Sequence, residues 1–226
     1  MKKYSILIPV HNEINSIDLL LESLTPLIED GHEIMIIDDG STDGSNQILK
    51  TSNLIKLITI NRNRGKGYAL KAGLENAKHN RIIVYDGDME LQPSDISRLM
   101  LLDKNKKISY VMGYRFKSLT PLKSNFDLGN FMFTSFFNIL FGFQHKDILC
   151  CAKAFYANDI KNYKVISDGF DIDIELAYLF TILNKKGKIP KVLLNYNRRS
   201  INEGKKLKMS DGWIILSRII KMIKYL

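Results

Sequence analysis

The sequence predicts an α/β fold built on a doubly wound, mostly parallel sheet that is flanked by helices. Short apolar runs alternate with helical patterns through the first half of the chain, the helical patterns begin with capping residues, and the apolar runs end in polar residues. Such an alternation implies right-handed crossovers and a parallel sheet. Because 226 residues fit one large α/β domain, we expect a single domain over residues 1–226.

The predicted strands are short, rich in β-branched residues and almost free of polar alternation, as is typical of strands covered on both faces. They are Tyr4–Val10, Glu33–Ile37, Ile55–Ile60, Arg81–Tyr85 and Ile108–Met112. The helical patterns between and after them are Ile14–Glu29, Asp43–Thr51, Gly65–His79 and Pro93–Lys104. Capping residues support two of the helix starts, at Ser41-Thr42-Asp43 and at Gln92-Pro93-Ser94-Asp95.

Polar residues follow every predicted strand of the first half. In open parallel sheets, ligands bind at the carboxyl ends of the strands. The stretches found there are His11-Asn12-Glu13, Asp38–Asp43, Asn61–Gly67, Asp86–Glu90 and Gly113-Tyr114-Arg115. A sheet built only for stability would not need them, so this edge is the candidate site.

Asp86, Asp88 and Glu90 alternate along the chain directly after the fourth strand. If the chain stays extended, alternate residues point to the same side. Three close carboxylates repel one another unless a cation lies among them, and Mg²⁺ is bound through one or two carboxylates plus substrate phosphates. Gly87 removes a side chain where a phosphate or sugar must come close. The alternative is a solvated turn, because short acidic patterns are common.

Gly65-Lys66-Gly67 opens a predicted helix after two arginines. Helix N-termini and cations attract anions, although the pattern is neither a Walker A loop nor a Rossmann fingerprint. The pair Asp38-Asp39 either caps a helix or accepts hydrogen bonds from a base or ribose, and the residues alone leave both interpretations open.

Two apolar helical patterns lie in the second half. Residues 125–143 hold seven of the eleven phenylalanines. Their polar residues form one stripe, which consists of Asp127, Asn130, Thr134 and Asn138. This segment is either a buried core helix or a helix at a membrane surface or lipid groove. The second pattern, Trp213–Leu226, combines a broad apolar face with basic residues, as membrane-surface helices do, but a docked terminal helix is amphipathic as well.

The net charge of +9 is concentrated near the C-terminus, since residues from 185 onward contain twelve Lys or Arg and two acids. Such a surplus suits nucleic acid or anionic lipid. The basic run lacks the interleaved aromatic residues of single-strand binding proteins, so we expect no nucleic-acid partner. The N-terminal apolar run is shorter than a signal peptide requires, and no segment offers roughly 18 uncharged apolar residues. We therefore expect a cytoplasmic protein, peripheral on the cytosolic membrane face.

Taken in order, IPVHNE, DDGSTD, NRGKG, DGDMEL and GYR resemble the motifs of family-2 glycosyltransferases with the GT-A fold. The likeness is greatest to the branch that transfers mannose or glucose to polyprenyl or dolichyl phosphate. It covers essentially the whole chain, and departs from the usual pattern at His11, where Tyr is usual, and at Glu90, where Gln is common. It implies a nucleotide-sugar-binding half over 1–115, an acceptor half over 116–210 and an amphipathic C-terminal helix over 211–226.

The resemblance also implies roles for single residues. Nucleotide-sugar contacts are implied for Pro9, His11, Glu13, Ile37, Asp39, Lys66, Asp86, Gly87, Asp88, Arg115, Arg199 and Lys205. A divalent ion, Mg²⁺ or Mn²⁺, would be held by Asp88 and Glu90. Catalytic roles fall on Asp88, Arg115, Asp173 and Glu175, of which the last two border the acceptor site. Arg199 and Lys205 belong to a stretch that resembles a flexible R-x-x-G-x-x-K loop.

The activity that the resemblance implies is inverting transfer of a hexose from GDP-mannose or UDP-glucose to a polyprenyl phosphate at the membrane surface, with room for a separate membrane-anchoring subunit. A lipid phosphate, with its second pKa near 6, is already anionic at neutral pH. A sugar hydroxyl would need a carboxylate base, for which Asp173 and Glu175 are the candidates. The alternatives are a transferase acting on a soluble or cell-envelope glycan and, in a different class, a nucleic-acid-binding module that uses the basic tail.

Overall fold

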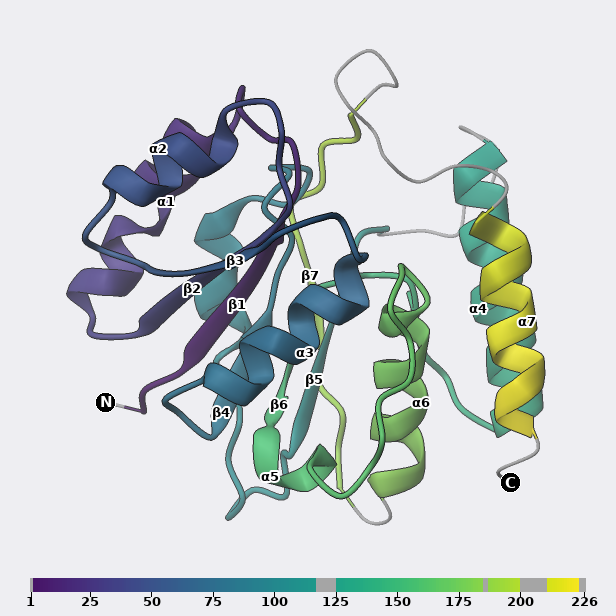
Figure 1. Ribbon diagram of the computed structural model, residues 1–226. Coiled ribbons are helices and arrows are strands. Elements are labelled where there is room, and N and C mark those ends of the chain that lie inside the picture. Colours follow the sequence, from purple (N-terminus) through teal and green to yellow (C-terminus); the bar gives the residue numbers. More distant parts are fainter. Residues whose placement is uncertain (1, 117–124, 185–186, 200–210, 224–226) are drawn as a thin grey trace.

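The computed structural model describes residues 2–116, 125–184, 187–199 and 211–223 (Figure 1). Within these residues one sheet has the strand order β3-β2-β1-β4-β6-β5-β7. The strands are β1 (Ser5–Val10), β2 (Glu33–Asp39), β3 (Lys56–Ile60), β4 (Arg81–Val84), β5 (Tyr110–Tyr114), β6 (Lys153–Tyr156) and β7 (Lys191–Leu193). The helices are α1 (Ile17–Glu29), α2 (Ser45–Thr51), α3 (Lys66–Asn76), the 3-10 helix η1 (Pro93–Leu99), α4 (Asn125–Phe141), α5 (Ala157–Ile160), α6 (Ile172–Leu183) and α7 (Asp211–Ile223).

Two hydrophobic cores cover the two faces of the sheet. One contains the inward residues of α1, α2 and η1, and the other contains those of α3, α6 and α7. Strands β1, β2 and β4 are therefore buried on both sides, which is why their sequences are almost uninterrupted apolar runs. The predicted doubly wound, mostly parallel sheet is confirmed.

Parallel pairing brings the ends of β1, β2 and β4 to one edge. Strand β1 pairs with β2 up to Val10 opposite Asp38, and it pairs with β4 up to Leu7 opposite Val84. Consequently the polar stretches that follow these three strands meet, although they lie far apart in the sequence.

The sequence patterns did not predict β6 and β7. Strand β6 runs antiparallel between β4 and β5, and β7 extends the sheet beside β5. The predicted helix over Pro93–Lys104 is wrong in type and length, because the segment forms η1 and ends at Leu99. Its buried Ile96 and Leu99 are three residues apart, which suits the three-residue turn of a 3-10 helix.

Helices α4 and α7 pack side by side at the edge of the molecule, beyond α6 (Figure 1). On α4 the predicted polar stripe faces the protein, with Asn130 and Thr134 buried, whereas the outward face is apolar. The exposed residues of that face are Leu128, Met132, Phe136 and Ile139. The inward side of α4 thus combines this polar stripe with the fully buried Phe137, while its outer side is apolar.

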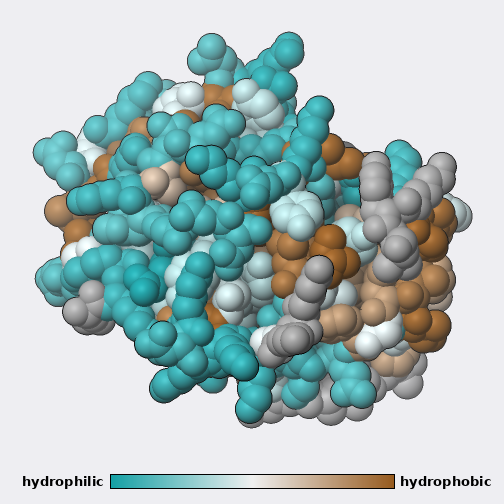
Figure 2. All heavy atoms as spheres, turned by 90° about the horizontal axis from the view of Figure 1, so that it is seen from below, coloured by the Kyte–Doolittle hydropathy of each residue, from teal (hydrophilic) through white to brown (hydrophobic). Residues whose placement is uncertain are grey.

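Helix α7 buries one apolar stripe and exposes another. Ile215, Ile219 and Met222 pack into the protein, so the docked-helix interpretation holds for this side. The exposed residues are Trp213, Ile214, Ile220 and Ile223, of which Trp213 is 75% exposed. Figure 2 shows apolar side chains gathered on the side that α4 and α7 occupy, while the rest of that view is largely hydrophilic. No helix in the described part of the chain is long and apolar enough to cross a membrane.

Candidate active site

A cavity of about 470 Å³ opens where β1, β2 and β4 end. Most of the predicted site residues line it. These are Pro9, His11, Glu13, Asp39, Lys66, Asp86, Gly87, Asp88, Glu90, Arg115 and Asp173. Asn63 and Gly65, from the predicted stretch Asn61–Gly67, line it as well, whereas the sequence analysis gave no role to the remaining lining residues, which are Val10, Leu149, Phe170 and Ile215.

The three carboxylates after β4 reach this cavity by a turn and not by an extended strand. Strand β4 ends at Val84, and Met89 has a positive φ of 60°. Asp86, Asp88 and Glu90 nevertheless all line the cavity. Burial first, and then the neighbouring charges of Asp86 and Glu90, raise the pKa of Asp88 to about 7. The acids therefore do repel one another, as the sequence suggested.

Gly87 lines the cavity and also has a packing role. A Cβ atom at this position would lie 2.7 Å from Cγ2 of Val10 and 3.1 Å from Cγ2 of Ile8. The glycine thus lets the acidic turn approach β1 closely. The expected close approach of a phosphate or sugar at Gly87 stays a prediction.

The donor set around Asp88 suits a hard divalent cation. The Asp88 carboxylate accepts a hydrogen bond from the Glu90 backbone N–H at 3.0 Å, and no lysine or arginine among the described residues pairs with it. No group of three His, Cys, Asp or Glu side chains within the described ranges is arranged to hold an ion. Two carboxylates completed by substrate phosphate oxygens and water are the usual set for Mg²⁺, so Asp88 and Glu90 fit as the protein's share.

Manganese binding is expected to strengthen as the pH rises from 6 to 8. The carboxyl of Asp88, with its pKa near 7, is largely protonated at pH 6 and must lose its proton to bind a cation. The apparent affinity should fall up to about tenfold per pH unit below 7. Calorimetric titration in buffers of different ionisation enthalpy measures both the affinity and the released proton. A pH-independent affinity without proton release would contradict this assignment.

Lys66 links the acidic turn to helix α6. Its Nζ lies 2.8 Å from an oxygen of Asp86 and 2.8 Å from one of Asp173, and its side chain is only 7% exposed. Burial alone would lower the pKa of Lys66, but Asp173 and Asp86 hold it well above its usual value. The fully buried Lys153 lies 3.9 Å from the other oxygen of Asp173. Asp173 is therefore flanked by two lysines.

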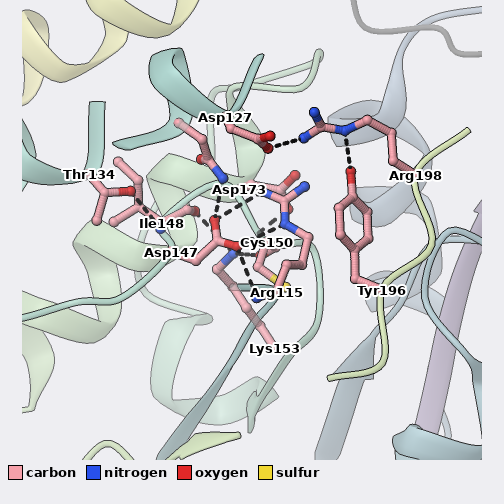
Figure 3. Close-up of polar contacts among 11 residues, drawn as sticks. Arg115, Asp127, Thr134, Asp147, Ile148, Cys150, Lys153, Asp173, Tyr196 and Arg198 are labelled. Atoms are coloured by element: carbon pink, nitrogen blue, oxygen red, sulfur yellow. Dashed lines mark hydrogen bonds and ion pairs between the residues drawn. The ribbon is translucent and has the colours of Figure 1, made fainter. Parts of the chain in front are cut away.

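Arg115 is held rigidly by Asp147 (Figure 3). Its Nε and Nη2 donate to the two oxygens of Asp147 at 2.8 and 3.0 Å, and its backbone N–H donates to the same carboxylate at 3.3 Å. Asp147 is fully buried, and although burial would raise its pKa, Arg115 holds the pKa below its usual value. This pairing fixes the plane of the guanidinium at the wall of the cavity.

Arg199 does not line the cavity itself but contacts three of its residues. Its Nη1 lies 2.7 Å from a Glu13 oxygen and donates to the Asp88 carbonyl at 3.1 Å, while its backbone N–H donates to Glu90 at 3.0 Å. Lys205, which was predicted beside it, lies outside the described residues. Arg199 thus brings a cation next to the acidic turn from a segment more than 100 residues away.

Asp39, which also lines the cavity, organises the loop before α3. Its two oxygens accept hydrogen bonds from the backbone N–H groups of Arg64 and Gly65, at 2.9 and 2.7 Å. The buried Nδ1 of His11 has no hydrogen-bond partner. A base or ribose in this part of the cavity would find both polar groups.

Besides Arg199, two further predicted residues within the described part of the chain do not line the cavity. Ile37 is fully buried in the core, and its side chain approaches Gly73 of α3. Ile37 and Asp39 point to the same face of β2, but Ile37 lies within the strand, where α3 covers it, whereas Asp39 is the last residue of the strand. Glu175 uses its oxygens to accept hydrogen bonds from the backbone N–H groups of Ile166 and Ser167, at 3.0 and 2.8 Å. Its carboxylate therefore fixes the segment before α6.

Comparisons with known proteins agree with this geometry. The profile described as "Glycosyl transferase family 2" matches residues 5–163. The chain is similar to undecaprenyl-phosphate 4-deoxy-4-formamido-L-arabinose transferases of Aeromonas hydrophila subsp. hydrophila and Yersinia pestis, with 36% identity over 108 residues in each case. These matches cover 44% of this chain and 33% of each relative, so the chain matches about a third of the relatives' length.

Solved structures share the fold at low sequence identity. Glucosyl-3-phosphoglycerate synthase from Mycobacterium tuberculosis in complex with UDP gives a TM-score of 0.75 at 16% identity, covering 99% of this chain and 80% of that chain. The complex with Mn²⁺, UDP and phosphoglyceric acid gives 0.75 at 17% identity, covering 98% and 78%. The expected GT-A arrangement of the sheet is thereby confirmed.

Proposed function

Because this chain belongs to glycosyl transferase family 2, we propose that it transfers a hexose from a nucleotide sugar to a polyprenyl phosphate at a membrane surface, with inversion at the anomeric carbon. Residues 1–115 would bind the donor, of GDP-mannose or UDP-glucose type, and the second half would bind the acceptor. The relatives named above, which act on undecaprenyl phosphate by their names, support this acceptor class.

The main support for a phosphate acceptor is the surroundings of the two candidate base carboxylates, Asp173 and Glu175. Asp173 lies between Lys66 and Lys153, and Glu175 is bonded to two backbone N–H groups away from the cavity. Glu175 is therefore not poised to take a proton from a sugar hydroxyl, which needs a general base. Asp173 has only Oδ1 for that task, which accepts no hydrogen bond and lies 3.9 Å from Lys153. A phosphate monoester, largely ionised at neutral pH, needs none. The site therefore favours an acceptor that arrives as an anion.

The acceptor end of the cavity and the surface beyond it suit a lipid. Leu149, Phe170 and Ile215 make this end apolar, and Ile215 belongs to α7. The outer faces of α4 and α7 continue as exposed apolar surface, with Ile139 80% exposed and Trp213 75% exposed. Exposed apolar surface with an amphipathic, Trp-containing helix is typical of interfacial binding. We infer that the isoprenoid chain enters from this side, with the protein peripheral on the cytosolic face.

On the donor side, the chain's own residues would hold the diphosphate. Asp88 and Glu90 would bind Mg²⁺ or Mn²⁺, which when bound neutralises the leaving diphosphate. Arg115, with its orientation set by Asp147, adds a positive charge at the cavity wall. Arg199 forms an ion pair with Glu13. On donor binding, its guanidinium would exchange this ion pair for one with a phosphate oxygen. Asp86 lines the cavity beside them, with Lys66 Nζ within 3.1 Å of both its oxygens, and this lysine would hold its carboxylate toward the sugar.

Replacing Glu175 by glutamine is expected to leave turnover within about threefold of the wild type. The amide oxygen still accepts one backbone N–H, and the side chain does not reach the cavity. Steady-state kinetics with the lipid acceptor measure the effect. A loss of a hundredfold or more with unchanged stability would mean that Glu175 is the base after all, and a hydroxyl acceptor would then be favoured.

The direct test is transfer of radiolabelled sugar from GDP-mannose or UDP-glucose, with Mn²⁺ and undecaprenyl phosphate in vesicles. We expect label in an organic-extractable, mild-acid-labile product, and flotation of the protein with the vesicles. Label that stays in the aqueous phase with an added glycan would favour the envelope-glycan alternative. No transfer from a panel of common sugar nucleotides would refute the proposed function.

A further inference from the structure

The inward polar stripe of α4 ends on two arginines of the candidate site (Figure 3). Asp127, in the first turn, forms an ion pair with Arg198. Asn130, one turn later, donates from Nδ2 to an oxygen of Asp147 at 3.1 Å, and Arg115 Nη2 binds the same oxygen at 3.0 Å. The helix therefore touches Arg198 directly and Arg115 through one buried carboxylate.

Both arginines stand next to the groups that would meet the diphosphate. Arg115 lines the cavity. Arg198 precedes Arg199, whose guanidinium and backbone N–H contact Glu13, the Asp88 carbonyl and Glu90. The hydroxyl of Tyr196 accepts a hydrogen bond from Arg198 Nε at 2.9 Å, which steadies this segment. A displacement of α4 would move both cations relative to the acidic turn.

The outer face of the same helix lacks a cover within the described chain. Leu128, Met132 and Ile139 are 41%, 59% and 80% exposed, and they lie on the side opposite Asn130 and Thr134. Helix α4 buries Phe137 in the core, but its outer apolar face gains nothing from burial until an apolar phase covers it. The adjacent exposed face of α7, with Trp213, widens this surface on one side of the molecule (Figure 2), and a lipid surface matches its chemistry.

We propose that α4 couples lipid contact on its outer face to the placement of Arg115 and Arg198 at the cavity, with Asp127, Asn130 and Asp147 as the positioning residues. The proposal rests on the lipid-surface function proposed above. By linkage, lipid that fixes α4 must strengthen binding of the donor's diphosphate, and diphosphate must strengthen binding to lipid by the same factor.

The test compares binding of the Mn²⁺ complexes of UDP and GDP to the full chain by calorimetry, with and without vesicles of phosphatidylcholine and phosphatidylglycerol. For the wild type we expect vesicles to raise the affinity for one of these complexes about fivefold or more. Asp127→Asn and Asn130→Leu should bind vesicles normally and lose this increase. Thr134→Val is the matched control, since Thr134 lies in the same stripe but accepts from the backbone N–H of Ile148 and touches neither arginine.

The outcomes separate this proposal from the function on which it rests. Wild-type protein that fails to float with vesicles, or that binds neither nucleotide, would refute the proposed function and this coupling with it. Binding of both without mutual enhancement, or enhancement that survives in Asp127→Asn and Asn130→Leu, would refute the coupling alone. If Asp127→Asn fails to fold, Arg198→Gln removes the same ion pair from its other partner, whose side chain is 25% exposed, and carries the same expectation. If Asn130→Leu fails to fold, Asp127→Asn alone decides.

Discussion

Replacing Asp88 by asparagine should abolish metal-dependent turnover, with a loss of at least about 10³-fold, and at the same time stabilise the metal-free protein at pH 8. The first effect follows from loss of the charge that binds the cation. The second follows from the raised pKa of Asp88, about 7 in the folded chain against about 3.9 in an unfolded one. The amide keeps the oxygen that accepts the Glu90 N–H.

The sign of the stability effect depends on pH. A carboxyl whose pKa is raised by folding costs nothing while it is protonated in both states, and its cost grows as the pH rises from about 4 to 7. At pH 8 the variant should gain a few kcal/mol, at about 1.4 kcal/mol for each pKa unit, and at pH 4 the gain should vanish. Urea unfolding in EDTA at both pH values measures this, with the exposed Asp18→Asn as the control. Retained turnover would remove Asp88 from the metal site, and equal stability at pH 8 would contradict its raised pKa.

Replacing Lys66 by methionine is expected to destabilise the protein by about 3–5 kcal/mol and to abolish activity. The change removes the cation from between Asp86 and Asp173, and Lys153 remains near Asp173 only, at 3.9 Å. Removing one partner of a buried ion pair leaves an uncompensated charge, which is the costly outcome. The acidic turn would also lose its anchor to α6.

Lys71→Met provides the matched control on the same helix. Lys71 pairs with Asp168 at 2.6 Å, but its side chain is 27% exposed and that of Asp168 is 58% exposed. Solvated pairs of this kind contribute about 0–1 kcal/mol. Urea unfolding at pH 7 should therefore separate the two variants clearly, and similar midpoints would contradict the role assigned to Lys66.

The fold could be predicted where local signals agree with burial. The apolar runs of β1 and β2 are typical of strands covered on both sides. Both strands begin and end within two residues of their predicted bounds. Strand β6, by contrast, has four residues, Lys153–Tyr156, one of them a fully buried lysine. Its place between β4 and β5 depends on pairing with strands some 40 to 70 residues away, which no local pattern encodes.

The sequence predicts which residues gather at the site, but not which ion pairs they form with one another. Residues that follow strands converge because parallel strands end at one edge, so the acids, Lys66 and Arg115 could be foreseen together. That Lys66 would bind Asp173, 107 positions away, or Arg199 bind Glu13 across 186, depends on the tertiary structure alone. The polar stripe of α4 was visible too, but only the contacts of Asn130 with Asp147 reveal that it faces inward.

The most direct test is a crystal structure with Mn²⁺ and the nucleoside diphosphate that binds, located by the anomalous signal of the metal. We predict a manganese ion bonded to an oxygen of Asp88 and to phosphate oxygens, with Arg115 facing the same diphosphate. Manganese and nucleotide bound elsewhere, with the acidic turn between β4 and η1 touching neither, would contradict the account.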